Sequence, residues 1–198
     1  MIEIINLNQE TPYLIFKEKY DNALSANQRN IEAISVSSFN RNKNEVDSRF
    51  VNLKIIENDE FIFFSNYRSP KSEAFKSNNQ ISALIFWSSI NLQIRIKAKI
   101  KKKSYAYNCE YFKKRHISKN ALAISSNQSN IIPSYDQVIK KYEDAKKNED
   151  LLICPDYWGG YSFSPYEIEF WEGHNFRLNK RDLYRYKNGL WHHSLLEP

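Results

Sequence analysis

Several basic side chains stand beside strand ends and helix starts that the sequence predicts. Lys71 falls in the first turn of a helix opened by Ser69 and Pro70. A cation there opposes the helix dipole, so a nearby anion, most naturally a phosphate, would explain it; the alternative is a solvated surface lysine. Arg49 and Lys54 bracket a predicted strand, and their five-residue separation puts them on opposite faces unless the strand bends or twists.

A second set combines aromatic, basic and amide side chains. Tyr111 and Arg115 are four positions apart and share one face of a predicted helix, an arrangement that suits a binding site and ordinary surface packing alike. The polar loop at Gln128-Ser129 offers uncharged hydrogen-bond donors. Two of the four glycines stand together at Gly159-Gly160, which indicates a tight turn or a close approach of the backbone to another group.

Other kinds of active site are not indicated. The chain carries no GxGxxG, P-loop, GxSxG or HExxH motif. The two cysteines, Cys109 and Cys154, lie 45 positions apart, and neither they nor the four histidines show metal-ligand spacing. We therefore expect no disulfide, no metal site and a reducing, cytoplasmic setting.

The net charge of +6 admits nucleic acid, an anionic surface or a phosphorylated small molecule as a partner. In the run 97–103, lysines at first alternate with apolar residues, which suits the solvated face of a strand. The basic residues are otherwise scattered, and no strand shows the interleaved aromatics of a base-stacking platform, so we expect no nucleic-acid partner. No signal peptide is apparent and no apolar window could span a bilayer, so we expect no membrane association either.

The elements that must position these residues are mostly short strands with helices between them. A helix is predicted at about 11–26, with Thr11 as its cap, and further helices at 69–77, 104–114, 120–125 and 134–147. Strands are predicted at 33–39, 49–55, 61–64, 81–87, 92–102, 161–163, 167–171, 176–181, 183–186 and 191–195, with a loop at 40–47. This order favours a mainly β protein, a small antiparallel barrel with peripheral helices, over a doubly wound parallel sheet. We expect one domain over residues 1–198, with a helical insert at about 104–148.

Taken in order, these segments resemble the pyridoxamine 5′-phosphate oxidase family over about residues 11–198. The last two motifs are the most specific. The resemblance rests on Arg49–Lys54, Phe64–Lys71, Leu92–Arg95, Tyr111–Arg115, Ser126–Ser129, Trp158–Tyr161 and Glu169–Arg181.

The resemblance implies an FMN-binding split antiparallel β-barrel that forms a homodimer, with one FMN in each of two interface clefts. Lys71 would contact the FMN phosphate, in keeping with the argument from charge. The residues implied to surround FMN are Arg49, Phe50, Val51, Asn52, Leu53, Lys54, Phe64, Ser65, Lys71, Gln93, Gln128, Ser129, Trp171 and Arg181.

The implied reaction oxidises pyridoxine or pyridoxamine 5′-phosphate to pyridoxal 5′-phosphate by hydride transfer from C4′ to FMN, with dioxygen as the final acceptor. Arg177 would lie over the pyridine ring opposite the flavin and is the implied catalytic residue. The implied substrate contacts are Lys54, Tyr111, Arg115, Lys119, Arg177 and Asn179.

Three positions depart from the family pattern. Asn179 stands where the family usually has histidine, Lys119 where it has serine, and Pro70 where it has arginine. Asparagine can donate and accept hydrogen bonds but does not titrate as histidine does. Two alternatives therefore stay open: an FMN oxidase of the same fold acting on another substrate, such as a phenazine precursor, and a flavin-binding module without catalysis.

Overall fold

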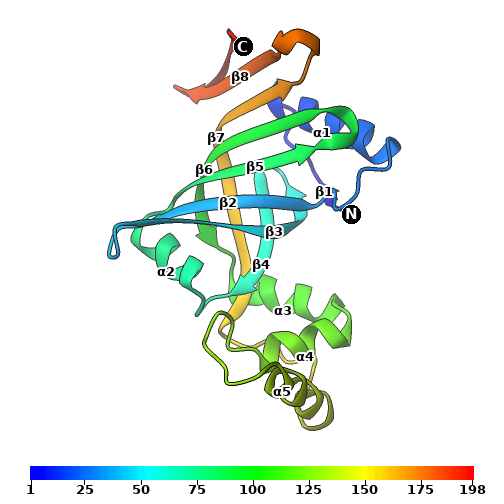
Figure 1. Cartoon of the computed structure of the whole chain (residues 1–198), viewed down its shortest axis with the longest axis vertical. Coiled ribbons are helices and arrows are strands. Elements are labelled where there is room, and N and C mark those ends of the chain that lie inside the picture. The colour runs from blue at the N-terminus through cyan, green and yellow to red at the C-terminus, as the bar shows by residue number, and fades with distance from the viewer.

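The computed structural model describes all 198 residues and places six antiparallel strands in a closed barrel (Figure 1). The barrel runs in the order β3, β2, β5, β6, β7, β4 and back to β3. Its strands are β2 (Ala33–Asn40), β3 (Glu45–Glu57), β4 (Glu60–Asn66), β5 (Gln80–Trp87), β6 (Leu92–Lys102) and β7 (Trp158–Glu172). The predicted class, a mainly β antiparallel barrel with peripheral helices, is confirmed.

Strict alternation of side chains builds the barrel interior. Along β5 the buried positions are every second residue from Ile81 to Trp87, and along β6 they run from Leu92 to Ile100. The lysines between them point outward, where Lys97 pairs with Glu167 at 2.9 Å. The run 97–103 is therefore largely the solvated face of a strand, as the sequence predicts.

Helix α1 (Thr11–Ser25) closes one end of the barrel with aromatic side chains (Figure 1). The Phe16 ring lies 5.1 Å from Phe61 and 5.6 Å from Trp87, centroid to centroid. The prediction that Thr11 caps this helix is wrong, because Glu10 occupies the N-cap position. The side-chain oxygen of Asn8 accepts from the Glu10 N–H at 2.8 Å, and this local turn begins the helix one residue sooner.

Three helices lie between β6 and β7 in sequence and gather at the other end of the barrel (Figure 1). They are α3 (Tyr105–Lys114), α4 (Ile117–Ser125) and α5 (Tyr135–Asn148), and we call them the helical lobe. The short helix α2 (Pro70–Ser77) packs beside β2. None of the helices is long and apolar enough to cross a membrane.

The remaining strands extend the sheet beyond the barrel. The pair β8 (Lys180–Lys187) and β9 (Leu190–Leu196) continues from β7, and β1 (Glu3–Ile5) runs parallel to the end of β3. Strand β1 was not predicted, because three residues carry too little pattern and its partner lies some 50 positions away.

Several predicted strand boundaries are wrong. The two strands predicted at 161–163 and 167–171 are one strand, β7, which absorbs Pro165 where its register against β6 shifts. The strand predicted at 176–181 is mostly a loop with a short 3-10 turn at Asn175–Arg177, and Phe176 and Arg177 have φ angles of 60° and 62°. The loop predicted at 40–47 is a tighter hairpin, since β3 already begins at Glu45.

Candidate functional site

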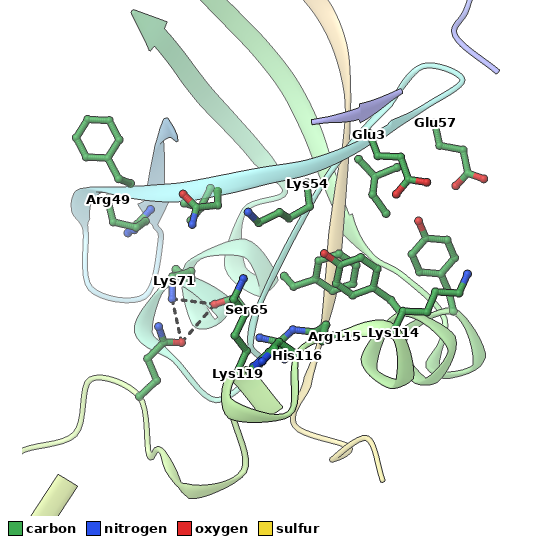
Figure 2. A pocket seen from close by; sticks show the side chains of 18 of the residues that line it. Glu3, Arg49, Lys54, Glu57, Ser65, Lys71, Lys114, Arg115, His116 and Lys119 are labelled. Atoms are coloured by element: carbon green, nitrogen blue, oxygen red, sulfur yellow. Dashed lines mark hydrogen bonds between the residues drawn. The ribbon is translucent and has the colours of Figure 1, made fainter. Parts of the chain in front are cut away.

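A pocket of about 980 Å³ lies between the barrel and the helical lobe (Figure 2). Strands β1, β3 and β4, helices α2, α3 and α4, and the loop at 128–129 contribute its lining. Most of the residues predicted to bind cofactor or substrate are brought together here. They are Arg49, Phe50, Val51, Asn52, Lys54, Phe64, Ser65, Lys71, Tyr111, Arg115, Lys119, Gln128 and Ser129, which we call the pocket group.

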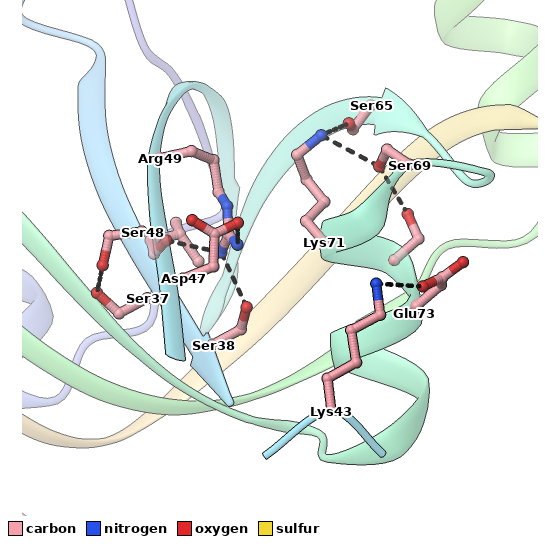
Figure 3. Close-up of polar contacts among 12 residues, drawn as sticks. Ser37, Ser38, Lys43, Asp47, Ser48, Arg49, Ser65, Ser69, Lys71 and Glu73 are labelled. Carbon is pink, nitrogen blue, oxygen red and sulfur yellow. Dashed lines mark hydrogen bonds and ion pairs between the residues drawn. The ribbon is translucent and has the colours of Figure 1, made fainter. Parts of the chain in front are cut away.

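Lys71 places a buried positive charge at one end of the pocket, and its side chain is only 8% exposed (Figures 2 and 3). Its ammonium donates to Ser65 Oγ at 3.0 Å, Ser69 Oγ at 3.1 Å and Gln128 Oε1 at 3.4 Å. All three partners are neutral. Burial, with the nearby Arg49 guanidinium, lowers the pKa of Lys71 to about 8. A cation held this way favours a bound anion, and the reading of Lys71 as a solvated surface lysine is wrong.

Arg49 is fixed beside Lys71 by contacts to the neighbouring strand β2 (Figure 3). Its guanidinium donates to the Val36 carbonyl and to Ser38 Oγ, both at 2.9 Å, and pairs with Asp47. These contacts leave the side chain along the pocket wall, so two cations from different elements face the same end of the pocket.

Arg49 and Lys54 line the same pocket although five positions separate them. The register of β3 against β4 shifts between Leu53, opposite Phe63, and Ile55, opposite Ile62, so Lys54 is the extra residue of a β-bulge. The bulge supplies the bend that the sequence argument required. Lys54 is not free, however: its Nζ donates to a Glu32 carboxylate oxygen at 2.9 Å.

The prediction that Leu53 surrounds the cofactor needs correction. Its side chain is fully buried in the barrel core and does not line the pocket. Leu53 precedes the bulge and keeps the inward direction of the β3 alternation. Its backbone N–H is also engaged, because it donates to the Glu32 carbonyl at 2.8 Å.

A stack of aromatic rings borders the pocket on the side of the helical lobe. The rings of Phe64 and Tyr111 lie 3.7 Å apart with 6° between their planes, and Trp158 lies beyond Phe64 at 5.2 Å. The Arg115 guanidinium lies over Trp158 at 4.3 Å and donates to Asn120 Oδ1 at 3.1 Å. Desolvation lowers the pKa of Arg115, whose charge has no carboxylate partner within ion-pair distance.

Further basic residues stand near Arg115. His116 and Lys119 are grouped with it at the start of α4, and Lys114 precedes it (Figure 2). Lys119, which replaces the serine of the family pattern, thus adds a positive charge to the pocket rather than to the outer surface.

The far end of the pocket carries acidic side chains that no local sequence pattern indicated. Glu3 and Glu57 meet there beside Tyr107 because β1 pairs with the end of β3 (Figure 2). Burial first, and then the Glu57 and Glu3 carboxylates, raise the pKa of the Tyr107 hydroxyl. One end of the pocket is therefore basic, and the other end carries two carboxylates, of which that of Glu57 lies 3.9 Å from Lys103 Nζ.

Besides Leu53, five predicted site residues lie outside this pocket. Gln93 faces Trp171 across β6 and β7, and Trp171 faces Arg181 across β7 and β8, so these three form one row. Arg177 and Asn179 lie in the loop that precedes β8. We call these five residues the strand group; they lie away from the helical lobe, toward the end of the barrel from which β8 extends (Figure 1).

Contacts inside the chain already engage part of the strand group. Arg181 Nε donates to Glu169 at 2.8 Å, and Asn179 Oδ1 accepts from the His174 N–H at 3.1 Å. Arg177 makes no side-chain hydrogen bond or ion pair. One chain therefore does not bring its strand group to its pocket group.

Comparison with known sequences identifies two kinds of similarity. Residues 158–198 match the model of the pyridoxine 5′-phosphate oxidase C-terminal dimerisation region. The chain is 32% identical over 188 residues to a pyridoxine/pyridoxamine 5′-phosphate oxidase of Actinobacillus pleuropneumoniae, covering 94% of this chain and 89% of that protein. It is 34% identical over 192 residues to the enzyme of that name from Colwellia psychrerythraea, covering 95% and 87%.

Solved structures show the same fold. PhzG from Burkholderia lata, solved with tetrahydrophenazine-1-carboxylic acid, superposes with a TM-score of 0.90 at 22% identity over 96% of this chain and 93% of that one. A pyridoxamine 5′-phosphate oxidase-related, FMN-binding protein from Nostoc punctiforme gives 0.77 at 11% identity over 92% and 97%. The barrel, the positions of the motifs along it and the identity to the curated relatives agree: this chain belongs to the pyridoxamine 5′-phosphate oxidase family.

Proposed function

We propose that this protein is an FMN-dependent oxidase that converts pyridoxine or pyridoxamine 5′-phosphate to pyridoxal 5′-phosphate with dioxygen as the final acceptor. The observation that carries the proposal is the buried ammonium of Lys71, which has only neutral partners and lines the pocket. A desolvated cation without a carboxylate is costly unless an anion compensates it. Residues with these properties fit the phosphate of FMN.

The end of the pocket around Lys71 offers a suitable set of groups for that phosphate. Lys71 and Arg49 would supply charge, while Ser65, Gln128 and Ser129 would supply neutral hydrogen bonds. The exposed side of β3, from Phe50 to Asn52, would border the rest of the cofactor. When bound, FMN supplies a hydride acceptor that dioxygen can reoxidise.

We propose that two copies of the chain complete each site. Most of the strand group falls in the segment 158–198 that matches a dimerisation region. The partner's strand group would then meet this chain's pocket group. Large apolar side chains are exposed on the barrel and in the loop before β8, which supports the proposal that a second copy covers this face. Among them are Phe50 at 77%, Phe86 at 57% and Phe176 at 93% exposed.

The substrate phosphate would bind at the helical-lobe side of the pocket. Tyr111, Arg115 and Lys119 would contact it, together with Lys54 if that lysine leaves Glu32. Arg177 and Asn179 would come from the other copy, with Arg177 over the pyridine ring. Their roles are to orient the ring and its C4′ substituent for hydride transfer, since a positioned geometry can supply much of the rate.

The test is anaerobic mixing of FMN-loaded protein with pyridoxine 5′-phosphate while the flavin absorbance is followed. Bleaching, with recovery when oxygen is admitted, is the expected result, and Arg177→Ala should keep FMN but lose turnover. Failure of the protein to bind FMN would overturn the cofactor assignment.

A second candidate is an FMN oxidase of the same fold acting on a different anionic substrate. Lys119 and Pro70 favour it, because both line the pocket and both differ from the family pattern. A flavin that binds but stays oxidised with both vitamin B6 phosphates would move the assignment to this candidate.

A further inference from the structure

The side chain of Asn108, on α3, closes a ring of hydrogen bonds with Tyr67 and Gly160. Asn108 is 2% exposed. The Gly160 N–H donates to Asn108 Oδ1 at 2.8 Å, Asn108 Nδ2 donates to the Tyr67 hydroxyl at 3.0 Å, and that hydroxyl donates to the Gly160 carbonyl at 2.9 Å. Since a backbone N–H can only donate, it fixes the orientation of the amide, and the three bonds then run in one direction around the ring.

The glycine pair makes room for this ring. A Cβ atom at Gly159 would overlap both Asn108 Nδ2 and the Tyr67 hydroxyl. The sequence predicted either a tight turn or a close backbone approach here; the structure shows the close approach, within the first residues of β7.

Besides the ring, polar contacts near its first turn hold helix α3: the Lys103 N–H donates to the Gly160 carbonyl at 2.8 Å, and the Tyr105 hydroxyl donates to the Cys154 carbonyl at 2.9 Å. The buried apolar contact of α3 is the small cluster of Phe112, Cys154 and Trp158, which is separate from the main barrel core. Apolar surfaces in contact can slide, whereas a closed ring of hydrogen bonds depends on the distance and direction of each bond and tolerates little displacement. The ring therefore adds a directional contact between the middle of α3 and the start of β7.

Two pocket residues follow Asn108 along α3. Tyr111 lies three positions later and Arg115, which ends the helix, lies seven positions later, so both are on the side of the helix that carries Asn108. A shift of α3 by one residue would move them by about 1.5 Å along the helix axis. The Phe64–Tyr111 stack and the Arg115–Trp158 contact both depend on that position.

We propose that Asn108 is a positioning residue: through its ring with Tyr67 and Gly160 it holds α3 so that Tyr111 and Arg115 face the pocket. The inference rests on the proposed function, in which those two residues bind the anionic group of the substrate. It assigns to Asn108 no contact with substrate or cofactor.

The test compares Asn108→Ala and Tyr67→Phe with a control, Asn8→Ala. Asn8 likewise donates and accepts one side-chain hydrogen bond, but in the loop before α1. For each variant we would measure the dissociation constant of FMN with the FMN-free protein. With the FMN-loaded protein we would then measure the dissociation constant of pyridoxal 5′-phosphate and the hydrogen exchange of the α3 amides.

Asn108→Ala should weaken pyridoxal 5′-phosphate binding about tenfold or more, while FMN binding changes less than about twofold. Its α3 amides should exchange faster than those of the wild type. Tyr67→Phe should show the same pattern more weakly, because the bond from Gly160 to Asn108 remains, and Asn8→Ala should leave all three readouts unchanged.

Two outcomes would overturn the inference. One is unchanged α3 exchange in Asn108→Ala; the other is an equal loss of affinity for both ligands, which indicates a general loss of structure. A wild-type protein that binds FMN but not pyridoxal 5′-phosphate would instead count against the proposed substrate, and α3 exchange would still decide the role of Asn108.

Discussion

The affinity for FMN should fall as the pH rises above about 8, because Lys71 must be charged to bind a phosphate. The ordinary lysine pKa is 10.5, and burial in the free pocket lowers that of Lys71 to about 8. A bound dianion would restore the charge, so binding and protonation are linked.

The size of the effect follows from the fraction of molecules with Lys71 charged. With a pKa of about 8, that fraction is roughly nine tenths at pH 7 and roughly one tenth at pH 9. The apparent dissociation constant varies inversely with the competent fraction, so it should rise about tenfold between these pH values. The FMN phosphate, with a second pKa near 6, stays dianionic throughout this range.

The assay is a titration of FMN fluorescence with the FMN-free protein at constant ionic strength from pH 7 to pH 9. Lys71→Arg keeps its charge over this range and should bind with an affinity that does not vary with pH. A wild-type dissociation constant that stays flat, or a slope that persists in Lys71→Arg, would refute the role assigned to Lys71.

Three further outcomes are expected. Lys71→Met should raise the unfolding free energy of the FMN-free protein at pH 7 by up to about 3 kcal/mol, as measured by denaturant titration. The reason is that the pKa of Lys71 in the folded state lies below its unfolded value of 10.5, so the fold disfavours the charged form. That gain should be complete below about pH 8 and shrink as the pH rises toward 10.5. Lys119→Ser should raise the KM for pyridoxine 5′-phosphate about fivefold in steady-state assays and leave the FMN affinity unchanged. Inactive Lys71→Met and Arg177→Ala proteins, unfolded together and refolded, should recover about one quarter of wild-type activity, since half of the random dimers would carry one intact site; no recovery would contradict a site shared between two copies.

Local patterns made much of the fold predictable. Side-chain alternation in β5 and β6 predicted both strands within a residue, and Ser69-Pro70 predicted the start of α2. The errors fall where a local signal misled. Pro165 divided β7 in the prediction because proline usually ends a strand, whereas a register shift absorbs it in the structure. The turn at Phe176 and Arg177 was missed because bulky residues rarely adopt positive φ.

The candidate site, too, was predictable only where a local sequence pattern carried the signal. The motifs from Arg49 to Arg181 identified the family and the residue types, because such signatures are read along the chain. The pairing of Lys54 with Glu32 could not be read from the sequence, since no rule of spacing joins residues 22 positions apart.

By itself, the sequence determined the barrel class, the family and the candidate residues, since propensities, periodicity and motifs act within short segments. The tertiary structure alone decided which charges are compensated. It left Lys71 with neutral partners, paired Lys54 with Glu32, and separated the strand group from the pocket group within one chain. The physical reason is that the desolvation and pairing of a charge depend on groups that only folding brings together.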